Sequence, residues 1–341
     1  MLRETLRKVA DGEALTEGEA ERALETIMEG NAPPAATAAL LTAMRVKGES
    51  VPEIVGFARA MRRFAAKVEA PEGVVDTCGT GGDAKGTINV STAAAFVARG
   101  AGVVVAKHGN RAATSQAGSA DVLEALGAEI DLGPDQVSRC IAEAGIGFMF
   151  ARTHHPAMRF VAPVRAELPF RTVFNLLGPL TNPAGASRQL VGVFGGNYVL
   201  PVAEALRDLG AEKALVVHGT DGMDEITVTD RTLVADVTDG EIEEYEISPE
   251  DFGLPRHAPD GLLGGDSHLN ARILRDILSG EETGAARDVV LLNAGAAIHV
   301  SGIAATIEEG VRLARDSISG GSAAKALQDF VRTTRRLSGT A

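Results

Sequence analysis

Residues 74–99 read VVDTCGTGGDAKGTINVSTAAAFVAR. The stretch predicts a short apolar strand over 74–76, a glycine-rich turn over 79–83 and an alanine-rich helix over 91–99. Glycines let backbone N–H groups approach a phosphate closely, and the N-terminus of a helix attracts anions. The order of strand, glycine turn and helix therefore predicts one unit of an α/β fold with a place for an anion, although such a glycine run can also be a simple tight turn.

The chain after residue 70 alternates between apolar strands and helices. Further strands are expected at 103–105, 148–150, 190–194, 214–217 and 289–292, and further helices at 119–126, 135–144, 304–316 and 322–336. Two runs, 232–238 and 241–247, flank Asp239-Gly240, which is a favoured two-residue hairpin turn. Alternation of this kind predicts a mainly parallel central sheet with helices on its faces.

Residues 1–67 predict helices only. Thr16 with Glu19 has the spacing of a capping box, in which each residue satisfies a backbone N–H group of the other. Ser50 with Glu53 repeats the pattern. These start signals, followed by apolar residues at helical spacing, predict a small bundle of three or four short helices.

One segment interrupts the alternation of strands and helices. A helix is expected over 156–168, and FNLLGPLTNP follows at 174–183. We expect this segment to return to the helical bundle and leave a cleft between the two domains. The predicted fold is therefore α/β, with a small N-terminal helical domain (1–67, joined by part of 156–185) and a larger α/β domain (71–341).

Composition limits the classes of function. The chain has 341 residues and a net charge of −13, which argues against a protein whose main task is to grip nucleic acid. No apolar run of about 18 residues predicts a membrane span, and the opening MLRETLRKVA resembles an amphipathic helix more than a signal peptide. Cys78 and Cys140 lie far apart and fit a reduced core. A cytoplasmic protein is the expectation.

Two further groups of polar residues and one arginine stand out. KHGNR at 107–111 follows the strand expected at 103–105, and ligands of open α/β sheets gather at the carboxyl ends of strands. HGTDGMDE at 218–225 also follows a strand, and its adjacent carboxylates, Asp224 and Glu225, are oxygen ligands that suit Mg²⁺. Solvated loops are the alternative for both groups. Arg165 lies on a predicted helix, where a lone arginine is ordinarily a surface residue.

Taken together in this order and spacing, GTGGD, NVST, KHGNR, GSADVLEALG, HPAM, FNLLGPLTNP and HGxxGxDE resemble the anthranilate phosphoribosyltransferase family over nearly the whole chain. The resemblance implies a fold shared with pyrimidine nucleoside phosphorylases and a homodimer formed through the helical domain. It also implies Mg²⁺-dependent transfer of phosphoribose from phosphoribosyl pyrophosphate to the amine of anthranilate, in tryptophan biosynthesis.

The resemblance also implies roles for individual residues. The expected phosphoribosyl pyrophosphate contacts are Gly79, Gly82, Asp83, Thr87, Asn89, Val90, Ser91, Thr92, Lys107, His108, Gly109, Asn110, Arg111, Ala112, Ala113, Thr114, Ser115 and Ser119. The expected metal ligands are Ser91, Asp224 and Glu225, and the expected anthranilate contacts are Gly79, Asn110 and Arg165. Lys107, Asn110 and Arg165 are expected to take part in catalysis. Arg152 and Pro169 depart from the family pattern near the expected anthranilate entrance.

The implied chemistry needs little proton transfer. An aryl amine is unprotonated at neutral pH, so positioning and charge neutralisation should carry catalysis, with His108 as a base the less favoured alternative. Two rival functions are a pyrimidine nucleoside phosphorylase on the same fold and a non-catalytic relative that binds nucleic acid. The Asp224-Glu225 pair, with Asn110 and Arg165, favours the transferase over the first rival, and the net charge of −13 opposes the second.

Overall fold

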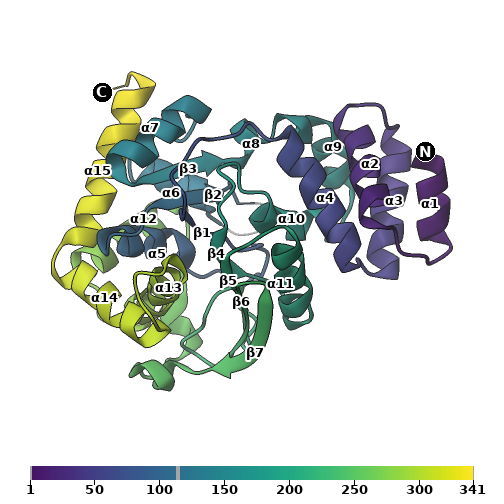
Figure 1. Ribbon diagram of the computed structural model, residues 1–341. Coiled ribbons are helices and arrows are strands. Elements are labelled where there is room, and N and C mark those ends of the chain that lie inside the picture. Colours follow the sequence, from purple (N-terminus) through teal and green to yellow (C-terminus); the bar gives the residue numbers. More distant parts are fainter. Residues whose placement is uncertain (1, 113–115, 341) are drawn as a thin grey trace.

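The structure is a computed structural model that describes residues 2–112 and 116–340 (Figure 1). Four helices at one end of the molecule form the helical domain: α1 (Leu2–Ala10), α2 (Glu17–Met28), α3 (Pro34–Lys47) and α4 (Val51–Phe64). Both predicted capping boxes are present. The fully buried Glu53 carboxylate also accepts a hydrogen bond from Leu15 N at 2.9 Å and pairs with Lys47 Nζ at 2.8 Å, so this cap joins three segments of the bundle.

A seven-stranded sheet, in the order β3-β2-β1-β4-β5-β6-β7, forms the centre of the larger domain. Its strands are β1 (Val75–Thr77), β2 (Val105–Gly109), β3 (Ile146–Phe150), β4 (Arg188–Gly192), β5 (Lys213–Gly219), β6 (Thr232–Thr238) and β7 (Glu241–Ile247). Strands β1 to β5 pair in parallel, and β5, β6 and β7 pair antiparallel. The predicted mainly parallel sheet is confirmed, and the short β1 lies in its interior.

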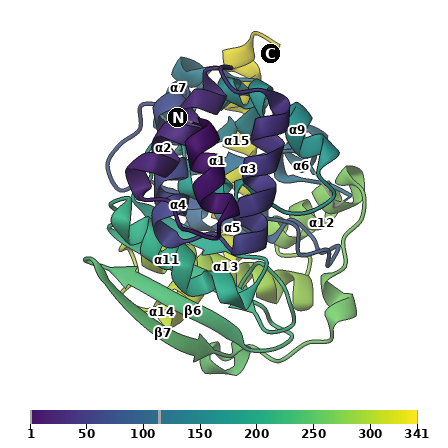
Figure 2. The same ribbon diagram turned by 90° about the vertical axis from the view of Figure 1, so that its right-hand side faces the viewer.

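Helices cover both faces of this sheet (Figures 1 and 2). The helices that follow the helical domain are α5 (Val90–Gly100), α6 (Ser119–Ala125), α7 (Pro134–Ala144), α8 (Ala151–His154), α9 (Ala162–Glu167), α10 (Phe174–Leu180), α11 (Val199–Asp208), α12 (Ser267–Ser279), α13 (Ala285–Ser301), α14 (Ile307–Ser319) and α15 (Ser322–Ser338). Short 3₁₀ turns lie at Pro156–Phe160, Gly196–Tyr198, Pro249–Phe252 and Pro259–Leu262.

Strand β5 shows how the sheet separates two cores. Its side chains alternate between the faces, as strand geometry requires. Leu215 and Val217 join the core that contains α5 and α13, whereas Ala214 and Val216 join the core shared by α11 and the helical domain. At β5 the sheet is therefore buried on both sides, which agrees with the continuous apolar run at 214–217.

The prediction of a strand at 289–292 is wrong. These residues lie inside α13, a helix of 17 residues that is buried on nearly every side. A short apolar run fits a buried helix as well as a buried strand, and only its flanks distinguish the two. Here the run continues into Asn293-Ala294-Gly295, and a Cβ on Gly310 of α14 would lie 2.1 Å from Gly295 O, so the two helices cross in close contact.

The segment 156–185 packs against the helical domain, although its helix is divided. The helix expected over 156–168 is a 3₁₀ turn followed by α9, separated at Val161. Helix α10 then carries Phe174, whose ring lies 6.4 Å from that of Phe57 in α4. This contact brings the segment and the bundle into one core.

The predicted hairpin is confirmed, with its turn at Asp239-Gly240. Asp239 (φ 52°) and Gly240 (φ 85°) both take the left-handed conformation that a tight two-residue turn between twisted strands requires. Cys78 and Cys140 are buried and form no disulfide, as expected. Among residues 2–112 and 116–340, no helix is long and apolar enough to cross a membrane.

Candidate active site

The candidate site lies at the carboxyl edge of the sheet, where the glycine turn after β1 meets the loop after β5. Gly81 N donates a hydrogen bond to Asp224 Oδ2 at 2.6 Å. The approach is so close that a Cβ on Gly79 would lie 2.7 Å from the same oxygen. A Cβ on Gly192, at the end of β4, would lie 1.6 Å from Asp224 O. These glycines therefore leave the space that Asp224 occupies.

Asp224 and Glu225 form a pair of buried acids. Burial, reinforced by the neighbouring Glu225 and Asp83 carboxylates, raises the pKa of Asp224 well above its usual value. Burial also raises the pKa of Glu225 to about 7, against the opposing effect of the Lys107 ammonium. Adjacent buried carboxylates favour a cation between or beside them.

Ser91 and Lys107 complete this cluster. Ser91 N, in the first turn of α5, donates to Glu225 Oε1 at 3.2 Å. Lys107 Nζ donates to Ser91 Oγ at 3.3 Å and to the carbonyl oxygen of Thr77 in β1. Lys107 is buried, so its ammonium supplies a fixed positive charge next to the two acids.

The donor set fits Mg²⁺ better than a soft metal ion. Ser91, Asp224 and Glu225 offer only oxygen atoms, and Mg²⁺ is commonly held by one or two carboxylates while phosphate oxygens fill the remaining positions. Within the described chain, no group of three or more His, Cys, Asp or Glu side chains forms a complete metal site. A phosphate-bearing ligand would therefore supply the missing oxygen atoms.

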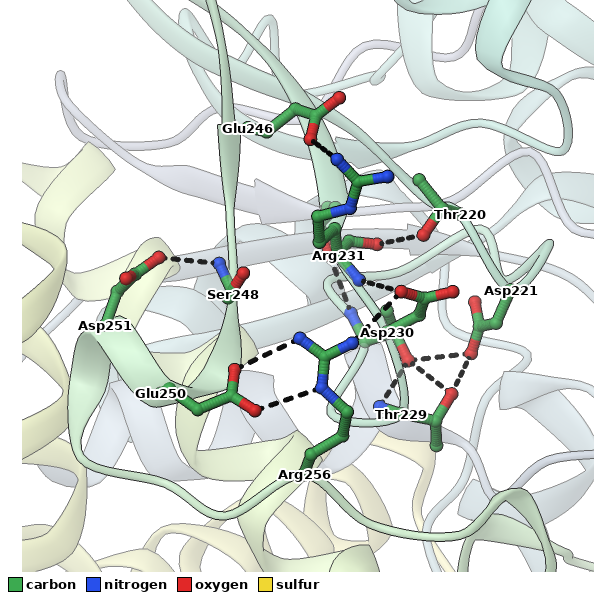
Figure 3. Close-up of polar contacts among 12 residues, drawn as sticks. Thr220, Asp221, Thr229, Asp230, Arg231, Glu246, Ser248, Glu250, Asp251 and Arg256 are labelled. Carbon is green, nitrogen blue, oxygen red and sulfur yellow. Dashed lines mark hydrogen bonds and ion pairs between the residues drawn. The ribbon is translucent and has the colours of Figure 1, made fainter.

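The loop that carries the two acids is held by its own polar contacts (Figure 3). Asp221 accepts hydrogen bonds from Met223 N at 3.1 Å and Thr227 Oγ1 at 2.7 Å, and from Thr229 Oγ1 as well. Thr220 donates through N and Oγ1 to Arg231 O, at 2.8 and 2.9 Å. These contacts close the loop on itself around the two acids.

A buried pair of histidines lies on the side of the site that faces α10. His108 Nδ1 lies 3.1 Å from Gly178 O, so this nitrogen carries the proton and donates it. The His108 and His155 ring centroids are 5.0 Å apart. Burial, with a smaller effect of His155, lowers the pKa of His108 to about 3. His108 is therefore a neutral ring and a weak base at neutral pH.

Arg165 lies on α9, away from the acids. Its guanidinium carbon is 5.3 Å from the centroid of Phe174, and the ion pairs of the described chain do not include it. Burial lowers its pKa, which remains far above neutral. Arg165 thus holds a half-buried positive charge on α9, a helix that packs against α3 of the helical domain, and this charge can meet an anion.

Comparison with known proteins agrees with this geometry. Residues 71–324 match the family described as "Glycosyl transferase family, a/b domain", and residues 3–65 match "Glycosyl transferase family, helical bundle domain". The anthranilate phosphoribosyltransferase of Rubrobacter xylanophilus is 81% identical over 339 residues, which cover 99% of each chain. That of Azorhizobium caulinodans is 55% identical over 98% of this chain and 97% of its own.

The chain belongs to the anthranilate phosphoribosyltransferase family. Solved structures of the family agree with the fold. The enzyme from Thermus thermophilus aligns with a TM-score of 0.92 and 47% identity, covering 97% of this chain and 99% of its own. The enzyme from Saccharomyces cerevisiae in complex with phosphoribosyl pyrophosphate and Mg aligns with a TM-score of 0.90 and 28% identity, covering 98% of each chain.

Most of the residues that are expected to contact phosphoribosyl pyrophosphate lie at the carboxyl edge of the sheet. Val90 and Thr92 are buried in the first turn of α5, and Thr92 Oγ1 has no hydrogen-bond partner within the described chain. Thr87 forms an isolated bridge with Leu263. Asn89 Nδ2 donates to Ala117 O at 3.1 Å. These contacts tie the loop before α5 to its neighbours.

The loop after β2 is only partly described, because Ala113, Thr114 and Ser115 lie outside the described residues. Gly109 ends β2, and Asn110 O accepts a hydrogen bond from Ser119 Oγ at 3.3 Å. The side chain of exposed Asn110 is not turned toward the acids: its Oδ1 accepts from Arg111 N at 2.8 Å.

Arg111 forms internal ion pairs. Its guanidinium donates to Asp121 Oδ1 at 2.9 Å and Glu124 Oε1 at 2.8 Å. Ala112 N also donates to Asp121, at 3.0 Å. In this arrangement Lys107, and not Arg111, provides the positive charge of KHGNR beside the acids.

Two positions that the sequence analysis missed belong to the site. The Arg171 guanidinium carbon lies 4.2 Å from the centroid of Phe194, and its NH2 group donates to the carbonyl oxygen of Gly82 in the glycine turn. Arg171 thus joins the segment before α10 to the glycine turn. Because it lies between two motifs, no spacing in a single sequence singles it out.

Asp76 is the second missed residue. It is fully buried in β1, where its carboxylate accepts from His108 N at 3.0 Å and from Asn182 Nδ2 at 2.7 Å. Burial raises the pKa of Asp76 to about 6, although Lys107 opposes the shift. The sequence could have indicated Asp76, because a carboxylate inside a buried strand needs polar partners.

Proposed function

We propose that this chain transfers the phosphoribosyl group of phosphoribosyl pyrophosphate to the amine of anthranilate, forming N-(5-phosphoribosyl)anthranilate and pyrophosphate in tryptophan biosynthesis. The observation that carries the proposal is the junction of Gly81, Asp224, Glu225 and Ser91, which places a glycine loop, a helix N-terminus and two acids at one point. The identities of the relatives support it, as does the yeast enzyme bound to phosphoribosyl pyrophosphate and Mg.

The donor would lie on the glycine turn and the first turn of α5. Backbone N–H groups of both segments suit phosphate oxygens, and Lys107 adds a buried positive charge. Mg²⁺, held by Ser91, Asp224 and Glu225, would supply charge neutralisation for the departing pyrophosphate. Lys107 stabilises the same negative charge as the bond to the ribose carbon breaks.

The acceptor would lie between the glycine turn and α9. We assign the anthranilate carboxylate to Arg165, because a guanidinium fork matches a planar carboxylate. Gly79 and Asn110 would position the ring and amine near the ribose. The amine attacks with its own lone pair, and the resulting proton can leave to water, so a weak base such as His108 is not required.

Assembly and location are part of the proposal. Val46 of α3 is 83% exposed and Phe160, beside the helical domain, is 38% exposed, which supports a homodimer formed through this end of the molecule. We keep the division into 1–67 with part of 156–185, and 71–341, and we place the protein in the cytoplasm. Light scattering of the purified chain, with Val46→Glu as the variant, tests the dimer.

A substrate comparison separates the proposed transferase from its nearest rival. Purified protein is incubated with anthranilate, phosphoribosyl pyrophosphate and Mg²⁺, and in parallel with thymidine and inorganic phosphate. We expect loss of anthranilate fluorescence in the first reaction and no release of thymine in the second. Release of thymine without consumption of anthranilate would reassign the chain as a nucleoside phosphorylase.

A further inference from the structure

A cavity lies outside the candidate active site, lined by residues of α12 and α15. These two helices lie at the end of the molecule opposite the helical domain (Figure 1). The cavity has a volume of about 710 Å³ and opens between the C-terminal ends of α6 and α12 and the side of α15. Its apolar walls come from Leu126, Leu278, Leu327 and Val331. A volume of this size is typical of sites that bind a small organic molecule.

Positive charge surrounds these apolar walls. Arg275, Arg332 and Arg335 line the cavity, and no carboxylate is among its described lining residues. The chain as a whole carries a net charge of −13, so this cluster is opposite in sign to the molecule. The cavity therefore has a local charge that attracts anions to a surface that otherwise repels them.

The arginines differ in how far they are already paired. Arg332 donates to Asp329 at 2.7 Å, and Lys325 pairs with the same carboxylate. Arg275 donates only a 3.4 Å hydrogen bond, to Ala125 O, and the ion pairs of the described residues include neither Arg275 nor Arg335. Two guanidinium groups are thus available to a ligand at the cavity.

We propose that this cavity binds a small amphipathic anion, an aromatic or branched aliphatic carboxylate. Its apolar part would lie against the leucines and valine, and its carboxylate would meet Arg275 and Arg335. Arginine suits this role because its planar fork donates two parallel hydrogen bonds to a carboxylate. Apolar walls with a few charged groups are the usual composition of such sites.

The two helices that form one wall also reach the donor side of the protein. Helix α6 begins at Ser119, and its C-terminal cap Leu126 lines the cavity. In α12, Asn270 Nδ2 donates to Asn89 Oδ1 at 2.9 Å, whereas Arg275 and Leu278, one to two turns later, line the cavity. Ser119 and Asn89 are among the phosphoribosyl pyrophosphate contacts that the family resemblance implies. A ligand in the cavity should therefore change the affinity for phosphoribosyl pyrophosphate, an effect that rests on the proposed function.

The binding test uses 8-anilinonaphthalene-1-sulfonate, an aromatic anion that fluoresces in apolar sites, with the full chain. We compare Arg275→Glu/Arg335→Glu with Arg272→Glu, an exposed arginine on α12 that does not line the cavity. We expect saturable binding that 4-phenylbutyrate displaces, at least about 10-fold weaker in the double variant and unchanged in the control. Equal binding by all three proteins overturns the proposal. If charge reversal disrupts folding, Arg275→Gln/Arg335→Gln provides the same comparison.

A kinetic test examines the link to the donor site. The KM for phosphoribosyl pyrophosphate is measured with and without 4-phenylbutyrate in the wild type, the double variant and the Arg272→Glu control. We expect a shift of several-fold in the wild type and control, and none in the double variant. A shift that survives in the double variant assigns the effect to the active site and contradicts the link. If the chain lacks transferase activity, the proposed function fails, but the binding test still shows whether the cavity binds an amphipathic anion.

Discussion

Gly81 and Asp224, which lie 143 positions apart in the chain, meet at 2.6 Å through a backbone N–H group and a buried carboxylate. This hydrogen bond joins the glycine turn after β1 to the acidic loop after β5. It makes the position of the donor loop depend on the proposed metal ligands. A change in either loop should therefore affect both phosphate binding and metal binding.

The first prediction concerns the two acids. Asp224→Asn/Glu225→Gln should reduce turnover at saturating Mg²⁺ by at least about 100-fold, since charge neutralisation at the leaving group is worth several kcal/mol. The fold should survive, because neutral amides fill the same space without repulsion. Steady-state kinetics measure the loss of turnover, and circular dichroism checks that the fold survives. Near-normal turnover in this variant would remove the metal role from these residues.

The second prediction concerns stability and pH in the absence of metal. The pKa of Glu225 is raised to about 7 in the folded state, so unfolding makes it more acidic and the folded protein should lose stability as pH rises from about 4.5 to about 7. Melting temperatures in EDTA should fall more steeply across this window in the wild type than in Glu225→Gln. Above pH 7, Mg²⁺ should restore the stability that the protein loses in EDTA. Parallel curves for the two proteins would show that Glu225 does not titrate in this range.

The third prediction concerns Arg165. Arg165→Ala should raise the KM for anthranilate by about 10- to 100-fold, the range expected for one lost charged hydrogen bond. The KM for phosphoribosyl pyrophosphate should remain nearly unchanged, and Arg165→Lys should restore little, because lysine lacks the fork. Equal increases for both substrates would mean that Arg165 supports the packing with Phe174 and does not contact the acceptor specifically.

The fourth prediction concerns Arg171. Because it donates to Gly82 O and stacks on Phe194, Arg171→Ala should raise the KM for phosphoribosyl pyrophosphate by about 3- to 10-fold. Arg159→Ala is a matched control, since Arg159 stacks on Phe160 at 4.7 Å on the same segment without touching the donor loop. The control should behave as the wild type. An equal effect in both variants would attribute the change to the segment as a whole.

The fifth prediction concerns the glycine at the end of β4. In Gly192→Ala the new Cβ would lie 1.6 Å from Asp224 O, so the acidic loop must move and activity should fall by at least about 100-fold. Gly133→Ala is the control, because its nearest contact is 3.7 Å away at the flexible end of Gln136. A fully active Gly192→Ala would show that the loop position does not matter.

Local signals account for what the sequence predicted well. Asp239-Gly240 identified the hairpin, because few residue pairs adopt two successive left-handed conformations. The capping box of Thr16 and Glu19 marked the start of α2, because each side chain accepts a hydrogen bond from the backbone of the other residue. Each feature depends on interactions within a few residues, so one sequence suffices to predict it.

Long-range packing accounts for what the sequence did not predict. The run at 289–292 became a helix because it packs between the sheet and α14, which its own composition does not reveal. Arg171 and Asp76 gained their roles from contacts 89 and 106 positions away. The order of the motifs identified the site, but the tertiary fold determines which of these side chains meet.

Anthranilate loss and pyrophosphate release, measured together in one reaction, test the proposed transfer of phosphoribose. Purified protein, anthranilate and phosphoribosyl pyrophosphate are incubated with Mg²⁺, and a matched sample contains EDTA. We expect one pyrophosphate for each anthranilate consumed, and no turnover with EDTA. Pyrophosphate release without loss of anthranilate, or turnover that is undiminished in EDTA, would contradict this proposal.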